Sequence, residues 1–302
     1  MIIKLFSVST PTKSRTTLRL LTALIGIVLL AGANTVHSGA DPKLFPRPAA
    51  IDPAVKFWVK VFSKIDTKHG YIHDHWNLNV IYEEIHLSKK YSRKKNKKRI
   101  KAAKKRYKQI LQTLAKGKRT GLTKEERRIL NLWPKGVSNK TLRKATRQIR
   151  FQLGQSDKFL AGLKRSGAWR DHILANLTKM GLPHEIAALP HVESSFNPKA
   201  YSSVGAAGLW QFTRSTGRRF MRVDHVVDER MDPFKASIAA AQLLEHNYAI
   251  TGTWPLAMTA YNHGAGGMRN AKRQVGTSDI DKIIFQYKSR SFKFASRNFY
   301  TA

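Results

Sequence analysis

Glu193 occupies a position where its surroundings could make it an acid catalyst. Ile186, Leu189 and Glu193 stand at positions i, i+3 and i+7 of a predicted helix, so they share one helix face. A carboxyl group among apolar side chains has a raised pKa, stays protonated near neutral pH and can donate a proton to a leaving oxygen. Pro190 could instead rotate this face and leave Glu193 in water. The spacing alone favours neither arrangement.

Two later segments combine polar side chains with small or apolar ones. Residues 202–212 carry several Gly and Ala residues before Trp210 and Gln211, and small residues let a ligand or another backbone come close. Gln211 offers both hydrogen-bond donors and an acceptor. Residues 256–264 end an apolar helical run with Tyr261 and Asn262. These segments are therefore candidate ligand contacts.

Three short motifs occur in a characteristic order along this half of the chain. They are Glu-Ser-Ser-Phe at 193–196, Gly-Leu-Trp-Gln at 208–211 and Ala-Tyr-Asn-His-Gly at 260–264. Together they resemble the sequential signatures of lytic murein transglycosylases with a soluble-lytic-transglycosylase (goose-lysozyme-like) domain. The Trp of the second motif resembles the membrane-bound lytic murein transglycosylase D type. The resemblance extends from about Gly154 to the end of the chain.

The resemblance implies a lyase that cleaves the β-1,4 bond between N-acetylmuramic acid and N-acetylglucosamine in peptidoglycan. Glu193 would be its sole acid and base, and the products would carry 1,6-anhydro ends. Motif by motif, the resemblance also implies substrate contacts by Ser202, Gln211, Tyr261 and Asn262.

A fourth family element, a Tyr near the end of the domain, matches this sequence less well. When the family motif is aligned on Arg297, its Tyr falls on Phe299, and Tyr300 is the next residue. We expect Tyr300 to supply this substrate contact.

Two alternative functions share the same motifs. A goose-type lysozyme would hydrolyse the same bond, and Asp224, Asp228 or Glu229 could then act as a second carboxylate, although nothing singles out one of them. A non-catalytic cell-wall-binding protein could keep the fold without the activity. Asp232 needs no catalytic role, because a helix N-cap followed by proline explains the Asp-Pro pair.

We expect neither a metal nor a cofactor. His69, His73, Asp74 and His75 are four potential ligands within seven residues, but nothing else in the sequence completes a recognisable metal-binding pattern. Cysteine is absent, which excludes a thiolate metal site, a disulfide scaffold and a lipid-modified Cys.

The charge of the chain is concentrated in its first half. The 302 residues have a formal net charge of +36. Four basic residues precede an apolar run at 20–33, which predicts a signal peptide over residues 1–40 and export to the periplasm or cell envelope. Basic residues are densest at 85–124, a segment without acids that we expect to contact an anionic envelope polymer or membrane surface. Export argues against nucleic acid as the partner.

The predicted fold class is all-α. Residues 41–165 are interpreted as a basic helical region, because apolar residues recur at helical spacing at Phe57, Val61 and Ile65, again over 100–114, and at Leu142, Ala145 and Ile149. Residues 166–302 are predicted to form a lysozyme-like catalytic domain. We expect no strand in this second part.

Overall fold

The computed structural model describes residues 40–88 and 90–302. Most of these residues are helical, which confirms the all-α fold class, and a three-stranded sheet is the main departure from it. The predicted signal peptide lies outside the described residues except for Ala40. Among the helices of residues 40–88 and 90–302, none combines the length and the apolar character needed to span a membrane.

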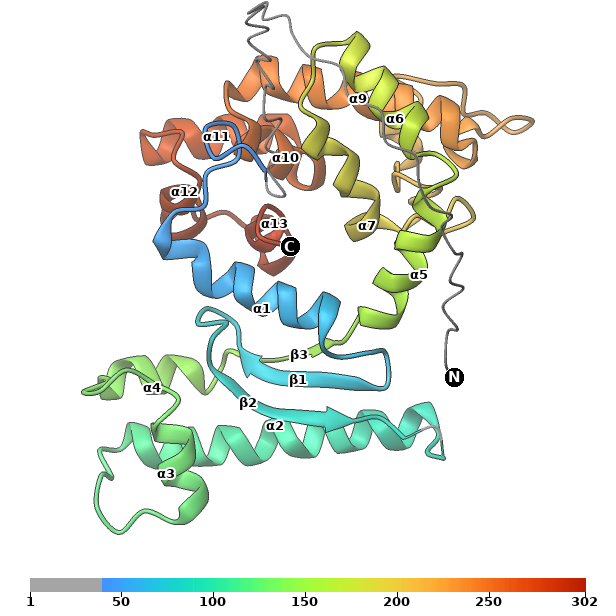
Figure 1. Cartoon of the computed structure of the whole chain (residues 1–302). Helices are drawn as coiled ribbons and strands as arrows, with labels where there is room; N and C mark the ends of the chain where they lie inside the picture. The colour runs from blue at the N-terminus through green and yellow to red at the C-terminus, as the bar shows by residue number, and fades with distance from the viewer. Residues whose placement is uncertain (1–39, 89) are drawn as a thin grey trace, which may run out of the picture. The chain divides into compact units, whose positions relative to one another are not determined.

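The first half of the described chain places a sheet between helices. The elements are η1 (Ala49–Ile51), α1 (Asp52–Ser63), β1 (His69–Asp74), β2 (Ile81–His86), α2 (Arg93–Ala115), α3 (Lys124–Leu130), α4 (Asn139–Ala145) and β3 (Ile149–Leu153). The strands are antiparallel in the order β2-β1-β3, with β1 in the centre. Figure 1 shows α1 on one side of this sheet and α2 on the other.

Residues 41–165, interpreted above as a basic helical region, thus contain three strands besides their helices. Ile149, assigned above to a helical pattern, begins β3. Alternate residues of β1 pack in opposite directions: Tyr71 joins a cluster with Phe57 and Val61 of α1, whereas Ile72 joins one with residues of α2. Because both faces of the central strand are covered, the polar-apolar alternation that would reveal a strand is missing.

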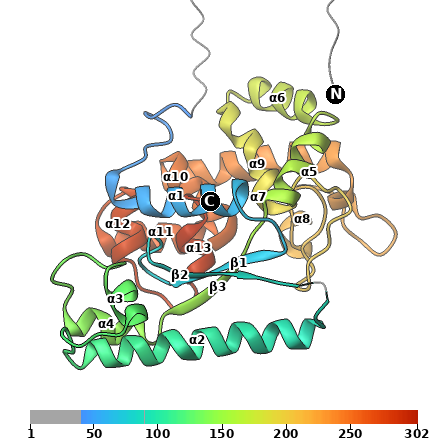
Figure 2. The ribbon, with the colours of Figure 1, turned by 60° about the horizontal axis from the view of Figure 1, so that its bottom comes forward.

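The basic helix α2 packs on the sheet by a narrow apolar stripe. Ala103, Tyr107, Leu111 and Leu114 are buried, while most of its Lys and Arg side chains are exposed. This confirms the predicted stripe, and Figure 2 shows α2 running along the sheet. At the start of α3, Thr123 and Glu126 form a capping box.

The second half of the chain is helical. Its elements are α5 (Ser156–Ser166), α6 (Arg170–Lys179), η2 (His184–Ala188), α7 (Leu189–Glu193), α8 (Arg214–Gly217), η3 (Glu229–Met231), α9 (Pro233–Thr251), α10 (Trp254–His263), α11 (Ala265–Val275), α12 (Ile280–Gln286) and α13 (Phe294–Asn298). The Ala-rich helix α9 lies at the centre of the largest apolar cluster and packs against α6 and α10. Asp232 caps α9 by accepting from the amides of Phe234 and Lys235, as predicted.

Candidate active site

Glu193 is the last residue of α7 and lines a cleft of about 940 Å³. Ile186 and Leu189 are buried in the main core, as their spacing predicts. The single helix expected there is divided, because Ile186 lies in the 3-10 segment η2 and Leu189 begins α7. The side chain of Glu193 is partly buried, and this burial raises the pKa of its carboxyl group from 4.5 to about 8. The carboxyl group therefore keeps its proton at neutral pH, as a general acid must.

The turn after Glu193 is held by hydrogen bonds from two directions. Ser195 and Phe196 both have positive φ angles, 52° and 53°, so the chain leaves α7 in a sharp and unfavourable turn. The guanidinium group of Arg165 on α5 donates to the carbonyl oxygens of Ser195 and Phe196, at 2.5 and 3.1 Å. The Ser194 hydroxyl donates to the carbonyl oxygen of Leu209, 2.7 Å away. These bonds fix the end of α7 that carries the acid.

Arg165 was not among the residues predicted from the sequence. It is one of many basic residues in its region, and only its two contacts with the turn distinguish it. Gly162, one helical turn earlier, lets α5 approach closely, because an added Cβ would lie 2.9 Å from the Ser195 carbonyl oxygen.

The loop over residues 200–212 borders the cleft through Ala200 and Tyr201. Ser202 and Gln211 instead form hydrogen bonds within the loop. The Ser202 hydroxyl accepts from the amide of Ala206 at 2.9 Å. Gln211 Nε2 donates to the carbonyl oxygens of Ala200 and Gly208. Both side chains shape the loop, and their contact with substrate stays a prediction.

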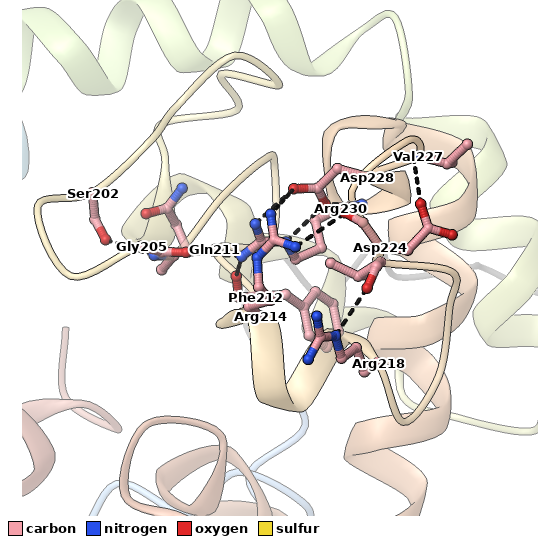
Figure 3. A network of polar contacts seen from close by, with 12 residues as sticks. Ser202, Gly205, Gln211, Phe212, Arg214, Arg218, Asp224, Val227, Asp228 and Arg230 are labelled. Atoms are coloured by element: carbon pink, nitrogen blue, oxygen red, sulfur yellow. Dashed lines mark hydrogen bonds and ion pairs between the residues drawn. The ribbon is translucent and has the colours of Figure 1, made fainter.

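Arg230 holds this loop to the rest of the molecule. Its side chain is fully buried and donates to both carboxylate oxygens of Asp228 and to the carbonyl oxygens of Gly205 and Phe212 (Figure 3). The sequence analysis did not identify this residue. The sequence feature that could have drawn attention to Arg230 is the acidic residue Asp228 two positions earlier, which was considered above as a possible second catalytic carboxylate.

Gly208 is required where the loop meets Arg230. Its φ is +78°, and an added Cβ would lie 1.7 Å from the Arg230 carbonyl oxygen. We expect Gly208→Ala to lower the free energy of unfolding by about 2–4 kcal/mol, through backbone strain and overpacking. Gly205→Ala is a matched control, because Gly205 has a φ of +82° but open space around it. It should cost only about 1–2 kcal/mol. Equal losses in urea denaturation would contradict this account.

Tyr261 and Asn262 come from the end of α10, beside Glu193. Tyr261 donates its hydroxyl to the carbonyl oxygen of Trp210 at 2.8 Å. Burial, and then the charge of Glu193, raises the pKa of Tyr261 well above its usual value. Asn262 lines the cleft and accepts a hydrogen bond from the Ser296 hydroxyl. The structure therefore brings these two residues and Glu193 together.

Phe299, and not Tyr300, faces the cleft. The ring of Phe299 stacks on that of Tyr261, with centroids 6.5 Å apart. Tyr300 packs against a different apolar cluster and donates its hydroxyl to the carbonyl oxygen of Pro46. Adjacent residues of this segment thus point to different sides, and a substrate contact by Tyr300 stays a prediction.

The cleft is basic except at Glu193. Among the described residues that line it, Glu193 is the one with a carboxylate side chain, and Arg150, Lys158, Arg165 and Lys199 are cationic. The candidates for a second carboxylate lie elsewhere. Asp224 and Glu229 accept bonds from Arg222, and Asp228 pairs with Arg230. This arrangement suits chemistry that needs one proton donor and no carboxylate nucleophile.

The far wall of the cleft comes from the first half of the chain. Trp58 and Phe62 of α1, Arg150 and Gln152 of β3, and Lys158 of α5 all line it. The predicted domain boundary at residues 165 and 166 stays a prediction, and residues on both sides of it line one cleft.

The three histidine side chains of residues 69–75 do not converge on one point. His69 contacts Asp66, His73 Nδ1 bonds the Asp74 carbonyl oxygen, and His75 lies beside Arg297. Within residues 40–88 and 90–302, no three His, Cys, Asp or Glu side chains are grouped as metal ligands.

Glycosidases generally use a pair of carboxyl groups, so a cleft whose described lining holds one protonated carboxyl side chain departs from that arrangement. Residues 173–284 match the family model described as "Transglycosylase SLT domain". This confirms the resemblance for the segment that holds all three motifs. Phe299 and the cleft wall from α1 and β3 lie outside it.

Similar proteins cover parts of the chain. It is 37% identical over 101 residues to "Membrane-bound lytic murein transglycosylase D" of Escherichia coli (strain K12), which covers 33% of this chain and 22% of that protein. It is 32% identical over 120 residues to "Putative tributyltin chloride resistance protein" of Alteromonas sp. (strain M-1), over 39% of this chain and 58% of that protein. The match to "Membrane-bound lytic murein transglycosylase F" of Maricaulis maris (strain MCS10) is 35% over 111 residues, 33% of this chain and 23% of that protein. The chain thus spans about a fifth of the two named transglycosylases.

Proposed function

We propose that this protein is a peptidoglycan lytic transglycosylase. It cleaves the β-1,4 bond between N-acetylmuramic acid and N-acetylglucosamine and leaves 1,6-anhydro ends. The observation that carries the proposal is Glu193, the one carboxylate side chain among the described residues of the cleft, with a pKa of about 8. The matched domain and the names of the relatives support the same reaction class.

Glu193 acts twice in the proposed reaction. It first donates its proton to the bridging oxygen, and the bond from that oxygen to the muramoyl anomeric carbon breaks. The acetamido oxygen of the same sugar bonds to the anomeric carbon and shares its positive charge. The Glu193 carboxylate then takes the proton of the muramoyl 6-hydroxyl, and oxygen 6 displaces the acetamido oxygen at the anomeric carbon. The proton is back on Glu193, and no water is consumed.

The side chains around Glu193 fit these steps. Tyr261 and Phe299 form an apolar stack beside the acid, which keeps the carboxyl group protonated before substrate binds. Asn262, held by Ser296, presents amide hydrogens for a sugar or its acetamido group. Ser202 and Gln211 hold the loop that presents Tyr201 and Ala200 at the cleft, and we propose that both also contact the substrate.

The pH dependence of cleavage follows from the raised pKa of Glu193. We expect kcat/KM on glycan strands to be level near neutral pH and to fall about tenfold per pH unit above about pH 8, where the acid loses its proton. An exposed Glu with the ordinary pKa of 4.5 would already lose activity above about pH 5. A pH-rate profile that declines between pH 5 and 7 would rule out the buried acid.

The product ends test the reaction class. A digest of purified sacculi should yield muropeptides with 1,6-anhydro ends by mass spectrometry. Reducing muramic ends alone would indicate a goose-type lysozyme, and no release at all a wall-binding protein.

We also propose that the protein is exported and acts at the cell envelope. The basic start and apolar run of residues 1–40 support export, and the relatives' names describe them as membrane-bound.

A further inference from the structure

A groove lined by cations leads away from the catalytic cleft. Two hollows, of about 670 and 420 Å³, share the residues Trp76, Arg147 and Gln148. The second hollow also shares Arg150 with the catalytic cleft. Together these hollows form what we call the α4 groove, and its cationic residues are Lys104, Lys140, Arg143, Lys144, Arg147 and Arg150.

The charge of the α4 groove is not neutralised within the described part of the chain. No Asp or Glu lines either hollow, and none of the six cations forms an ion pair there. The Nε of Arg150 is buried and has no hydrogen-bond partner, while its guanidinium group lies 4.0 Å from the centre of the Phe294 ring. A buried donor of this kind costs free energy unless a ligand satisfies it.

The position of Arg150 indicates the kind of ligand. This residue lines the cleft that holds Glu193 and also begins the groove, so a ligand in the groove would be continuous with a strand in the cleft. The groove residues precede the matched segment 173–284. Guanidinium groups bind carboxylates with two parallel hydrogen bonds, which lysine cannot do.

We propose that the α4 groove binds the carboxylates of the peptide stems carried by the glycan strand in the cleft. This inference rests on the proposed function, because it takes the occupant of the cleft to be peptidoglycan. The groove would then favour strands that still carry their stems over strands without them. A strand with stems carries peptide carboxylates that extend away from the sugars and suit a row of unpaired cations. A strand stripped by an amidase keeps only the lactyl carboxylates next to its muramic acid rings.

The test measures binding without cleavage. The parent is the full chain with Glu193→Gln, and the probes are soluble glycan fragments before and after an amidase has removed their stems. The variant adds Lys140→Ala, Lys144→Ala and Arg147→Ala, all at exposed positions. The control adds Arg269→Ala, Lys272→Ala and Arg273→Ala, which remove the same charge from exposed positions of α11.

We expect the α4-groove variant to bind stem-bearing fragments about tenfold more weakly, about 1.4 kcal/mol, and to bind stripped fragments as the parent does. The α11 control should match the parent on both. Equal weakening on both fragments, no weakening, or the same loss in the α11 control would overturn the proposal. The proposal would also be overturned if the α4-groove variant lost binding only to phosphatidylglycerol vesicles, because that result would indicate that the groove binds a membrane surface. If the parent binds neither fragment, the proposed function itself fails.

Discussion

Glu193→Gln should lower the rate of glycan cleavage by about 10²–10⁴-fold, the usual contribution of a general acid. Glutamine has nearly the same shape but cannot donate a proton to the bridging oxygen or accept one from the 6-hydroxyl. No other carboxylate side chain lines the cleft among the described residues, so none can take over. Release of soluble fragments from sacculi measures the effect. A variant that retains most of the parent's activity would remove Glu193 from the mechanism.

The stability of Glu193→Gln shows whether a loss of activity comes from the chemistry or from unfolding. Folding raises the pKa of Glu193 from 4.5 to about 8, because burial disfavours the charged form. The cost of burying this group is therefore absent below about pH 4.5, grows as the pH rises to about 8, and is constant above that. Glu193→Gln should stabilise the protein by about 1–3 kcal/mol at pH 7 and by little at pH 4.5. Lost activity with a raised Tm would then be a chemical effect and not unfolding.

Arg230→Met should lower the free energy of unfolding by about 3–5 kcal/mol. The substitution keeps an apolar stem but leaves the Asp228 carboxylate without its partner. It also leaves the carbonyl oxygens of Gly205 and Phe212 without a donor, because Arg230 donates to them at 2.8 and 2.9 Å. Because this residue connects the 200–212 loop to the core, cleavage should fall as well.

Arg222→Met is the matched control for Arg230→Met. Arg222 also pairs with an acid in the same segment, Asp224, but its side chain is 60% exposed. Removing an exposed pair costs about 1 kcal/mol or less. Denaturation curves compare the two variants. Similar losses would mean that burial of Arg230 does not determine the stability of this segment.

The catalytic helix was predictable because its signals are local. Ile186 and Leu189 are buried as their spacing predicts, although the helix expected there is divided into η2 and α7. The cap at Asp232 likewise follows from residues within one helical turn. The sheet was not predictable in this way. The central strand β1 is covered on both sides, and a register shift between Ile72 and His73 interrupts its pairing with β2, so no regular alternation appears in the sequence.

The cleft depends on contacts between distant segments. Trp58 and Arg150 reach the neighbourhood of Glu193 only because α1 and β3 lie against the second half of the chain, and no spacing in the sequence encodes this. The sequence could not show, for a related reason, whether Phe299 or Tyr300 lines the cleft. Which of two adjacent aromatic residues enters the cleft depends on how the end of the chain packs, and here the Pro46 carbonyl oxygen holds Tyr300 away.

The structure shows where the cationic residues that give the net charge of +36 lie. Part of it coats the exposed face of α2, the segment expected to contact an envelope surface, and part lines the groove that meets the catalytic cleft. Apart from Lys104 of α2, which lines the groove, the two sets of cations lie on different elements. They can therefore be removed separately, and their roles in adhesion and in substrate choice can be measured apart.

The central claim is that one acid cleaves the strand without using water. The most direct measurement is a digest of purified sacculi in water labelled with heavy oxygen, followed by mass spectrometry of the products, with Glu193→Gln as the control. Transglycosylation predicts muropeptides with 1,6-anhydro ends, lighter by one water than the hydrolysed form and free of the label, and none from the variant. Products that carry the heavy oxygen at reducing muramic ends would show hydrolysis and contradict the account.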